Sequence, residues 1–187
     1  MATFTKQPES TPPNMGFWQD LAVLLRLRKR DANILVVGLD NSGKSTIINY
    51  LKPKQLAASQ IVPTVGFRVD KIKSYHSRSV LNSNIQFPSL ARLDDRLNLT
   101  AFDMAGQSRY RSLWERYYVD CHGVIFVIDS CDSMRMAVAA NELHLMIQHP
   151  EMMANSIPIL ILANKCDLPN ARTVDQVKMA SPSHNFS

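Results

Sequence analysis

Three short apolar runs, each followed by polar residues, set the main pattern of the chain. They cover residues 33–37, 123–128 and 157–163, and their length and β-branched side chains are typical of strands buried on both faces. Apolar and polar positions alternate over residues 66–73 and 97–102, which predicts two further strands. Because helical segments separate the strands, we expect an α/β fold with a mostly parallel sheet and helices on both faces.

Three stretches have the apolar spacing of helices. Residues 44–52 follow the first strand and end before Pro53. Residues 132–147 follow the next apolar run, and Asp132 is a candidate N-cap. Residues 17–28 place apolar side chains on one face, so we predict an amphipathic helix near the N-terminus.

Polar segments set the boundaries of the expected domain. Residues 1–15 are polar and rich in proline, which predicts a disordered leader, and residues 181–187 predict a polar tail. Between them we expect the amphipathic helix within residues 16–30 and one domain over residues 31–180, in which residues 74–96 form a long loop.

The charge distribution indicates a membrane surface as a partner. Of the 187 residues, 45% are hydrophobic and 20% are charged, as in globular proteins, and the net charge is +5. Much of the basic excess lies in one cluster at residues 26–30, so we expect residues 16–30 to bind an anionic membrane surface, and we expect no nucleic-acid partner. Three scattered cysteines predict free thiols in a reducing compartment, which indicates a cytoplasmic protein.

The strongest motif follows the first strand. Residues 38–45 match the phosphate-binding pattern G-x-x-x-x-G-K-[ST]. The glycines let backbone N–H groups point at phosphate oxygens, Lys44 adds positive charge at the β- and γ-phosphates, and Ser45 offers a hydroxyl to Mg²⁺. The residues expected to hold the nucleotide here are Gly38, Asp40, Asn41, Ser42, Gly43, Lys44, Ser45 and Thr46.

A second motif, Asn164-Lys165-Cys166-Asp167, follows the third apolar run and predicts a guanine site. The Asp167 carboxylate can accept hydrogen bonds from guanine N1 and from the exocyclic amine. Adenine offers no donors at those positions, so Asp167 would be left buried and unpaired. We therefore expect Asn164, Lys165 and Asp167 to select GTP and GDP.

Residues between these two motifs predict a metal site and a role in hydrolysis. The segment Asp103-Met-Ala-Gly106-Gln107 ends a predicted strand. Asp103 is placed to serve Mg²⁺, the Gly106 amide to reach the γ-phosphate, and Gln107 to orient the attacking water. Upstream, Thr64 can lend its hydroxyl to the metal when the γ-phosphate is present. The expected metal residues are Ser45, Thr64 and Asp103.

Together these motifs resemble the ADP-ribosylation factor (Arf) family of small GTPases. The loop at residues 38–45 has the family's G-L-D-x-x-G-K form, and residues 63–67, 103–114 and 127–130 are also similar to the family. A resemblance to the ciliary, Bardet–Biedl-associated branch of the Arf-like group is carried by residues 40–42, 49–53, 102–104 and 109–111.

The resemblance implies a P-loop fold and a GTP/GDP switch that hydrolyses GTP slowly, with Mg²⁺ as cofactor. It also implies protein effectors in membrane and ciliary trafficking, an exchange factor and an activating protein. The implied location is peripheral to a membrane, at the cilium or its base. In this family the hairpin between the two switch segments shifts when GTP binds and moves the N-terminal helix onto the bilayer.

Three departures from the family pattern leave other functions open. Residues 74–96 are inserted in that hairpin, the leader precedes Met15, where family members usually begin, and the family's last strand and final helix have no counterpart after Asp167. One alternative is an interaction module with impaired nucleotide binding. Another is an ATP-using P-loop protein, against which Asp167 argues.

Overall fold

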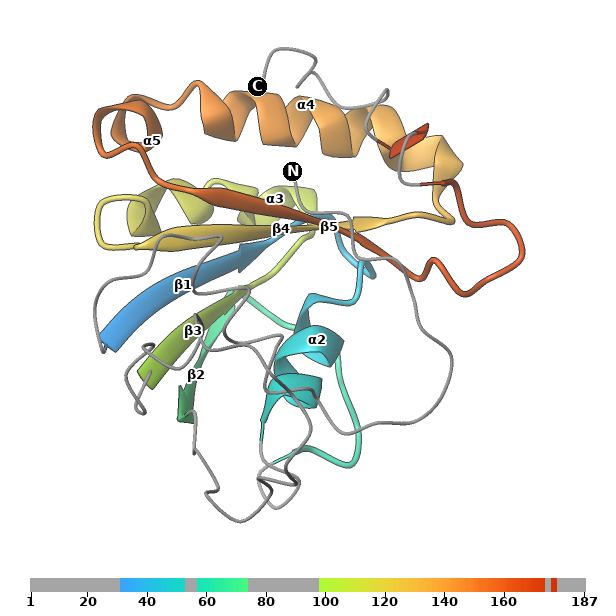
Figure 1. Ribbon diagram of the computed structural model, residues 1–187, viewed down its shortest axis with the longest axis horizontal. Helices are drawn as coiled ribbons and strands as arrows, with labels where there is room; N and C mark the ends of the chain where they lie inside the picture. Colours follow the sequence, from blue (N-terminus) through green and yellow to red (C-terminus); the bar gives the residue numbers. More distant parts are fainter. Residues whose placement is uncertain (1–30, 53–56, 74–97, 174–175, 178–187) are drawn as a thin grey trace, which may run out of the picture.

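The strand β1 (Asp31–Val37) runs through the middle of a five-stranded sheet (Figure 1). The computed structural model describes residues 31–52, 57–73, 98–173 and 176–177. The sheet order is β2-β3-β1-β4-β5, in which the other strands are β2 (Phe67–Lys73), β3 (Asn98–Met104), β4 (Gly123–Asp129) and β5 (Ile159–Asn164). Neighbouring strands are parallel except β2 and β3. The mostly parallel sheet predicted from the apolar runs is confirmed.

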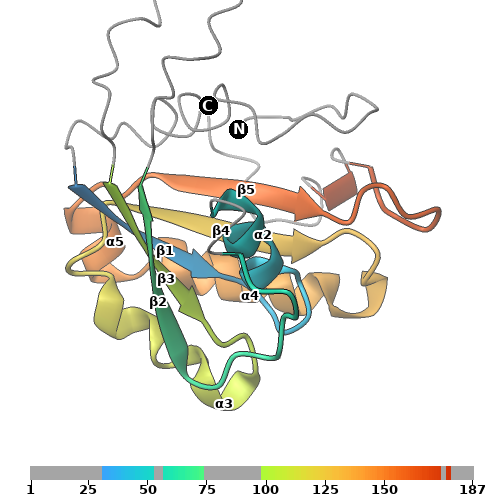
Figure 2. The same ribbon diagram turned by 90° about the horizontal axis from the view of Figure 1, so that it is seen from below.

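Helices cover both faces of this sheet (Figure 2). On one face lies α2 (Lys44–Leu51), whose Ile48 belongs to the same buried cluster as Ile34 of β1. On the other face Leu143 shares a cluster with Leu35 of β1. That face is covered by α4 (Met136–Ile147), α5 (Pro150–Ala154) and the 3₁₀ helix η2 (Trp114–Tyr117). Because successive side chains of a strand point to opposite faces, the apolar run of β1 supplies both cores.

The helix predicted over residues 132–147 is divided in the structure. Ser133–Arg135 form a 3₁₀ turn, η3, and α4 begins at Met136. The Asp132 side chain accepts a hydrogen bond from the Arg135 backbone N–H at 3.1 Å, so Asp132 is a cap, but of the 3₁₀ turn. The short elements α3 (Ser108–Arg111), η2 and α5 contain too few apolar positions to produce a helical pattern in the sequence.

The antiparallel pair β2–β3 determines where the predicted loop begins and ends. The register runs from Phe67 opposite Met104 to Lys73 opposite Asn98. Both ends of the segment 74–97 are therefore attached to paired residues. β3 also continues two residues beyond the alternation that predicts it, so that Asp103 lies inside the strand.

Several expectations lie outside the described residues. These are the disordered leader at 1–15, the amphipathic helix within 16–30, the loop at 74–96 and the tail at 181–187. Within the described part of the chain, β5 is an edge strand of the sheet. None of the helices described there is long and apolar enough to cross a membrane.

Candidate functional site

The loop after β1 meets the guanine motif at a glycine. Gly43 caps the N-terminus of α2 with a φ of 96°, a conformation that favours glycine. A Cβ atom on Gly43 would lie 2.2 Å from Asn164 Nδ2. That nitrogen donates to the Ser42 carbonyl oxygen at 2.7 Å. The first residue of the guanine motif is therefore held directly against the phosphate loop, and a side chain at Gly43 would displace it.

Lys44 is buried at the start of α2 and reaches back over the loop. Its Nζ donates to the Leu39 carbonyl oxygen at 2.7 Å. Burial lowers the pKa of Lys44 to about 8, although the carboxylates of Asp103 and Asp40 oppose the shift. A buried cation is costly unless an anion lies beside it. A phosphate bound in the loop, at the positive end of α2, would supply that anion.

The three predicted metal ligands lie within hydrogen-bonding distance of one another. Ser45 Oγ donates to Asp103 Oδ2 at 2.6 Å and lies 3.0 Å from Thr64 Oγ1. The Thr64 hydroxyl contacts the same Asp103 oxygen at 3.3 Å. Asp103 is fully buried, and burial raises the pKa of its carboxyl, while the hydrogen bond from Ser45 and the charge of Arg68 act in the opposite direction.

This donor set fits Mg²⁺. Two hydroxyls and a carboxylate are hard oxygen ligands, and Mg²⁺ is usually held by a few such groups together with phosphate oxygens and water. The other carboxylate oxygen, Asp103 Oδ1, is buried and has no hydrogen-bond partner among the described residues. Leaving it unpaired is costly, so the position favours a cation or a water bound to that cation. The described residues contain no group of three or more His, Cys, Asp or Glu that could hold a metal, so the hydroxyls are essential to this assignment.

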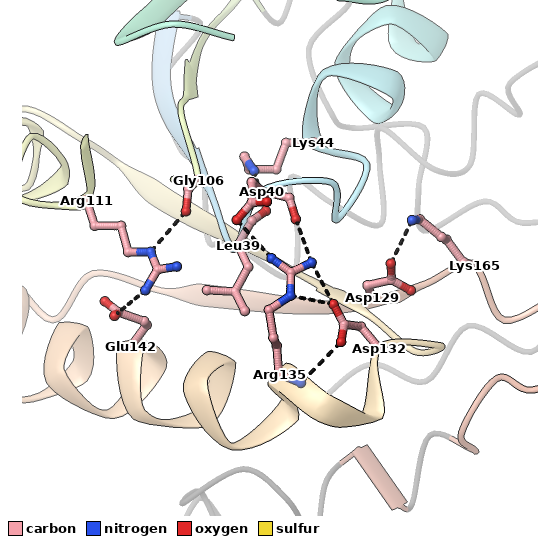
Figure 3. A network of polar contacts seen from close by, with 10 residues as sticks. All are labelled: Leu39, Asp40, Lys44, Gly106, Arg111, Asp129, Asp132, Arg135, Glu142 and Lys165. Atoms are coloured by element: carbon pink, nitrogen blue, oxygen red, sulfur yellow. Dashed lines mark hydrogen bonds and ion pairs between the residues drawn. The ribbon is translucent and has the colours of Figure 1, made fainter. Parts of the chain in front are cut away.

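The segment after β3 lies against the phosphate loop. A Cβ atom on Gly106 would come within 2.2 Å of the Asp40 backbone N. Arg111 also holds this segment, because its Nε donates to the Gly106 carbonyl oxygen at 2.9 Å and its Nη1 contacts Glu142 of α4 at 2.8 Å (Figure 3). Gly106 is thus fixed next to the phosphate loop, and only a glycine can approach it so closely.

Gln107 follows Gly106 and is exposed at the start of α3. Its side-chain oxygen accepts a hydrogen bond from Arg109 Nε at 3.1 Å, so the amide is directed along α3. Asn41 and Thr46 are also exposed. The roles expected for these three residues stay predictions.

The other two predicted base-binding residues of the guanine motif differ in their contacts. Lys165 adopts a positive φ of 61° just after β5, and its Nζ pairs with Asp129 Oδ2 at 2.6 Å. Asp167 is exposed, and it makes no hydrogen bond or ion pair with another residue in the described part of the chain. Its carboxylate is accessible to a base.

Sequence reasoning missed three charged residues of this site. Asp129, which holds Lys165, ends β4, and its position at the carboxyl end of a parallel strand is a signal that could have identified it. Arg135 and Glu142 reach Asp40 and Arg111 across sequence separations of 95 and 31 residues. No local pattern distinguishes these two from other charged residues on helices.

Known proteins have sequences similar to this one. The sequence model of the ADP-ribosylation factor family matches residues 18–186. ADP-ribosylation factor-like protein 6 of Danio rerio is 44% identical over 163 residues, which are 87% of this chain and 77% of that protein. The protein of the same name in Caenorhabditis elegans is 43% identical over 166 residues, which are 89% of this chain and 77% of that protein.

A solved structure has a similar fold. The Arl6 BBS3 small GTPase from Trypanosoma brucei, with the nucleotide analogue GppNp bound, superimposes with a TM-score of 0.63 and 33% sequence identity. The match covers 80% of this chain and 77% of that one. The family match over most of the chain agrees with the sheet and with the position of the phosphate loop, and the chain belongs to the ADP-ribosylation factor family of small GTPases.

Proposed function

We propose that this protein binds GDP and GTP with Mg²⁺, hydrolyses GTP slowly and acts as a two-state switch. One observation carries the proposal: separate motifs meet at one phosphate loop. Ser45 and Asp103 approach within 2.6 Å, and Asn164 contacts Ser42 at 2.7 Å. The similar Trypanosoma brucei structure has a nucleotide analogue bound, which supports nucleotide binding by this chain.

Each part of the nucleotide has a matching group. The phosphates lie on the loop N–H groups and the N-terminus of α2, with Lys44 beside them. Asn164, Lys165 and Asp167 surround the base, and Asp167 accepts from the two donors that distinguish guanine. Ser45, Thr64 and Asp103 would hold Mg²⁺, which would supply positive charge to neutralise the phosphates.

The contacts of two arginines at the site support the proposal that hydrolysis is slow. Gln107 orients the attacking water, but both Arg111 and Arg135 are engaged by carboxylates, those of Glu142 and Asp132 among them. An arginine supplied by an activating protein raises the rate of such enzymes by ~10³–10⁵. Because Gln107 acts in the transition state, Gln107→Leu should lower single-turnover hydrolysis and leave GTP binding nearly intact.

Nucleotide competition tests the proposal. The purified protein is expected to carry GDP or GTP, and excess GTP, but not ATP, should displace bound fluorescent GDP. Asp167→Asn exchanges an acceptor for a donor and should shift preference toward xanthosine diphosphate. Equal displacement by ATP would exclude guanine selection. A properly folded protein that binds neither nucleotide would instead be an interaction module.

We further propose a role in membrane and ciliary trafficking, with effectors, an exchange factor and an activating protein as partners. The similarity of this chain to ADP-ribosylation factor-like protein 6 of Danio rerio and Caenorhabditis elegans supports this proposal. Residues 16–30 would bind anionic membranes and place the cytoplasmic protein at the membrane surface, at the cilium or its base. Flotation with anionic and neutral liposomes tests this, and binding that is indifferent both to lipid charge and to Leu21→Asp would contradict it.

A further inference from the structure

Arg135 joins the phosphate loop to the segment after β4. Its Nη1 lies 2.9 Å from Asp40 Oδ1, and its Nη2 donates to the Asp40 carbonyl oxygen at 3.3 Å. The same guanidinium contacts Asp132 Oδ2 at 2.6 Å. Figure 3 shows Arg135 between the two carboxylates, on the α4 side of the loop. Asp132 is itself fixed, because its other oxygen caps the Arg135 backbone N–H.

Asp40 makes this contact important for ligand binding. Asp40 puts a carboxylate in the loop that has to accept the phosphates of a nucleotide, and these like charges repel each other. Asp40 and Arg135 both lie close enough to Lys44 to act on its charge, with opposite signs. The loop therefore contains a negative group that opposes phosphate, and Arg135 of η3 brings a positive group beside it that cancels this charge.

We propose that Arg135 is a positioning residue for phosphate binding: it neutralises Asp40 and fixes the loop in the shape that accepts a nucleoside di- or triphosphate. The inference rests on the proposed nucleotide binding. Arg135 acts through Asp40 and does not contact the ligand, because its guanidinium is already shared between Asp40 and Asp132.

Arg135 contributes to phosphate binding and adds little to the stability of the folded protein. The side chains of Arg135 and Asp40 are 36% and 45% exposed, and ion pairs this exposed add little to stability. A bound phosphate displaces water from the loop, so the uncancelled charge of Asp40 then acts at a lower effective dielectric. The predicted loss of affinity therefore increases with ligand charge.

A double-mutant cycle tests this inference. Dissociation constants for GDP and for GppNp are measured for wild type, Arg135→Ala, Asp40→Asn and the double variant. Arg135→Ala should weaken GDP about tenfold, which corresponds to ~1.4 kcal/mol. It should weaken GppNp about threefold more than GDP, because the extra phosphate adds charge near Asp40. The extra loss should shrink at high salt, where the Debye length falls to ~3 Å at 1 M.

Rescue separates positioning from a structural role. With Asp40→Asn present the phosphate loop itself carries no carboxylate for Arg135 to neutralise, so adding Arg135→Ala should change affinity by less than about threefold. If Arg135 contacts the ligand or merely maintains the fold, Asp40→Asn will not rescue, and the inference is wrong. The matched control is Arg116→Ala, which removes the same charge from an exposed position on η2.

The outcomes also separate this inference from the function on which it rests. Wild-type protein that binds no GDP would overturn the proposed function and this inference with it. Wild type that binds GDP while Arg135→Ala binds equally well would overturn only the role of Arg135. Arg135→Lys gives a further readout, because retained charge should preserve most of the affinity if neutralisation is the cause.

Discussion

Replacing Gly106 by alanine should separate GTP binding from GDP binding. The added Cβ would lie 2.2 Å from the Asp40 backbone N and 2.5 Å from the Gly38 carbonyl oxygen, whereas real Cβ atoms stay beyond 3.0 Å. Both neighbours are backbone atoms of the phosphate loop, so neither can rotate away. The segment after β3 and the loop must therefore separate by at least 0.8 Å, the difference between 3.0 Å and the 2.2 Å approach to the Asp40 backbone N.

The expected loss of GTP affinity follows from the effect of this displacement on one hydrogen bond. In the proposed GTP complex the Gly106 amide donates to the γ-phosphate, and a bond of ~2.9 Å that lengthens by 0.8 Å is lost. Hydrogen bonds to charged groups contribute about 1.5–3 kcal/mol, so affinity for GTP should fall roughly tenfold to a hundredfold. GDP has no γ-phosphate, and its affinity should change by less than about threefold.

Equilibrium titration with fluorescent GDP and GppNp measures both affinities on one preparation. Ser108→Ala, at an exposed position two residues away, is the matched control and should leave both affinities unchanged. Equal losses for the two nucleotides would refute the argument, since the clash would then act on the phosphate loop itself. An unchanged affinity for GppNp would show that the Gly106 amide does not reach the γ-phosphate.

Three further predictions concern the scaffold. Replacing residues 74–97 with Asn-Gly, the two-residue turn that suits hairpins, should leave the thermal midpoint within a few degrees of wild type by circular dichroism, because Lys73 and Asn98 are already paired. If the inserted segment obstructs the hairpin shift, the same replacement should also speed the conformational response to GppNp. Leu143→Ala should cost about 2–5 kcal/mol in urea unfolding, since this side chain of α4 is fully buried in the core that the helix shares with the sheet. Burial raises the pKa of Cys121 from 9.0 to about 11, so as pH rises the thiol loses its proton in the unfolded chain before it does so in the folded protein. The contribution of Cys121 to stability should be complete below pH 9 and lost as pH rises toward 11, and the Cys121→Ala variant should not show this loss of stability.

The parts of the fold that the sequence predicts are those with a local cause. β4 is buried along its length, so its unbroken apolar run is unambiguous. The phosphate loop is equally local, because glycine spacing and Lys44 specify its shape within eight residues. The predicted metal site involves three distant segments that meet at one edge of the sheet: Ser45 follows β1, Asp103 lies near the end of β3, and Thr64 precedes the antiparallel β2. The sequence could therefore place Thr64 and Asp103 near each other, and their hydroxyl and carboxylate oxygens are 3.3 Å apart.

What the sequence did not predict depends on tertiary contacts between charged side chains. Arg135 and Glu142 lie on η3 and α4, where charged residues are common and usually face solvent. Only the packing of α4 beside the phosphate loop gives them partners. The 3₁₀ turn before α4 has the same origin, because Asp132 uses its side chain both to cap the turn and to hold the Arg135 guanidinium.

The contacts of the phosphate loop favour an anionic ligand, as the proposed function requires. Donors from the protein already engage the loop's acceptors: Lys44 binds the Leu39 carbonyl, Asn164 binds the Ser42 carbonyl, and Arg135 binds the Asp40 side chain and carbonyl. Arg135 lies on η3 after β4 and Asn164 ends β5, so two of these donors come from the β4–β5 side of β1, and the third, Lys44, begins α2 directly after the loop. What the loop then offers a ligand is N–H groups at the positive end of α2. Removing any of the three donors leaves an acceptor of the loop unpaired, so in the proposed nucleotide complex its loss should weaken triphosphate binding more than diphosphate binding.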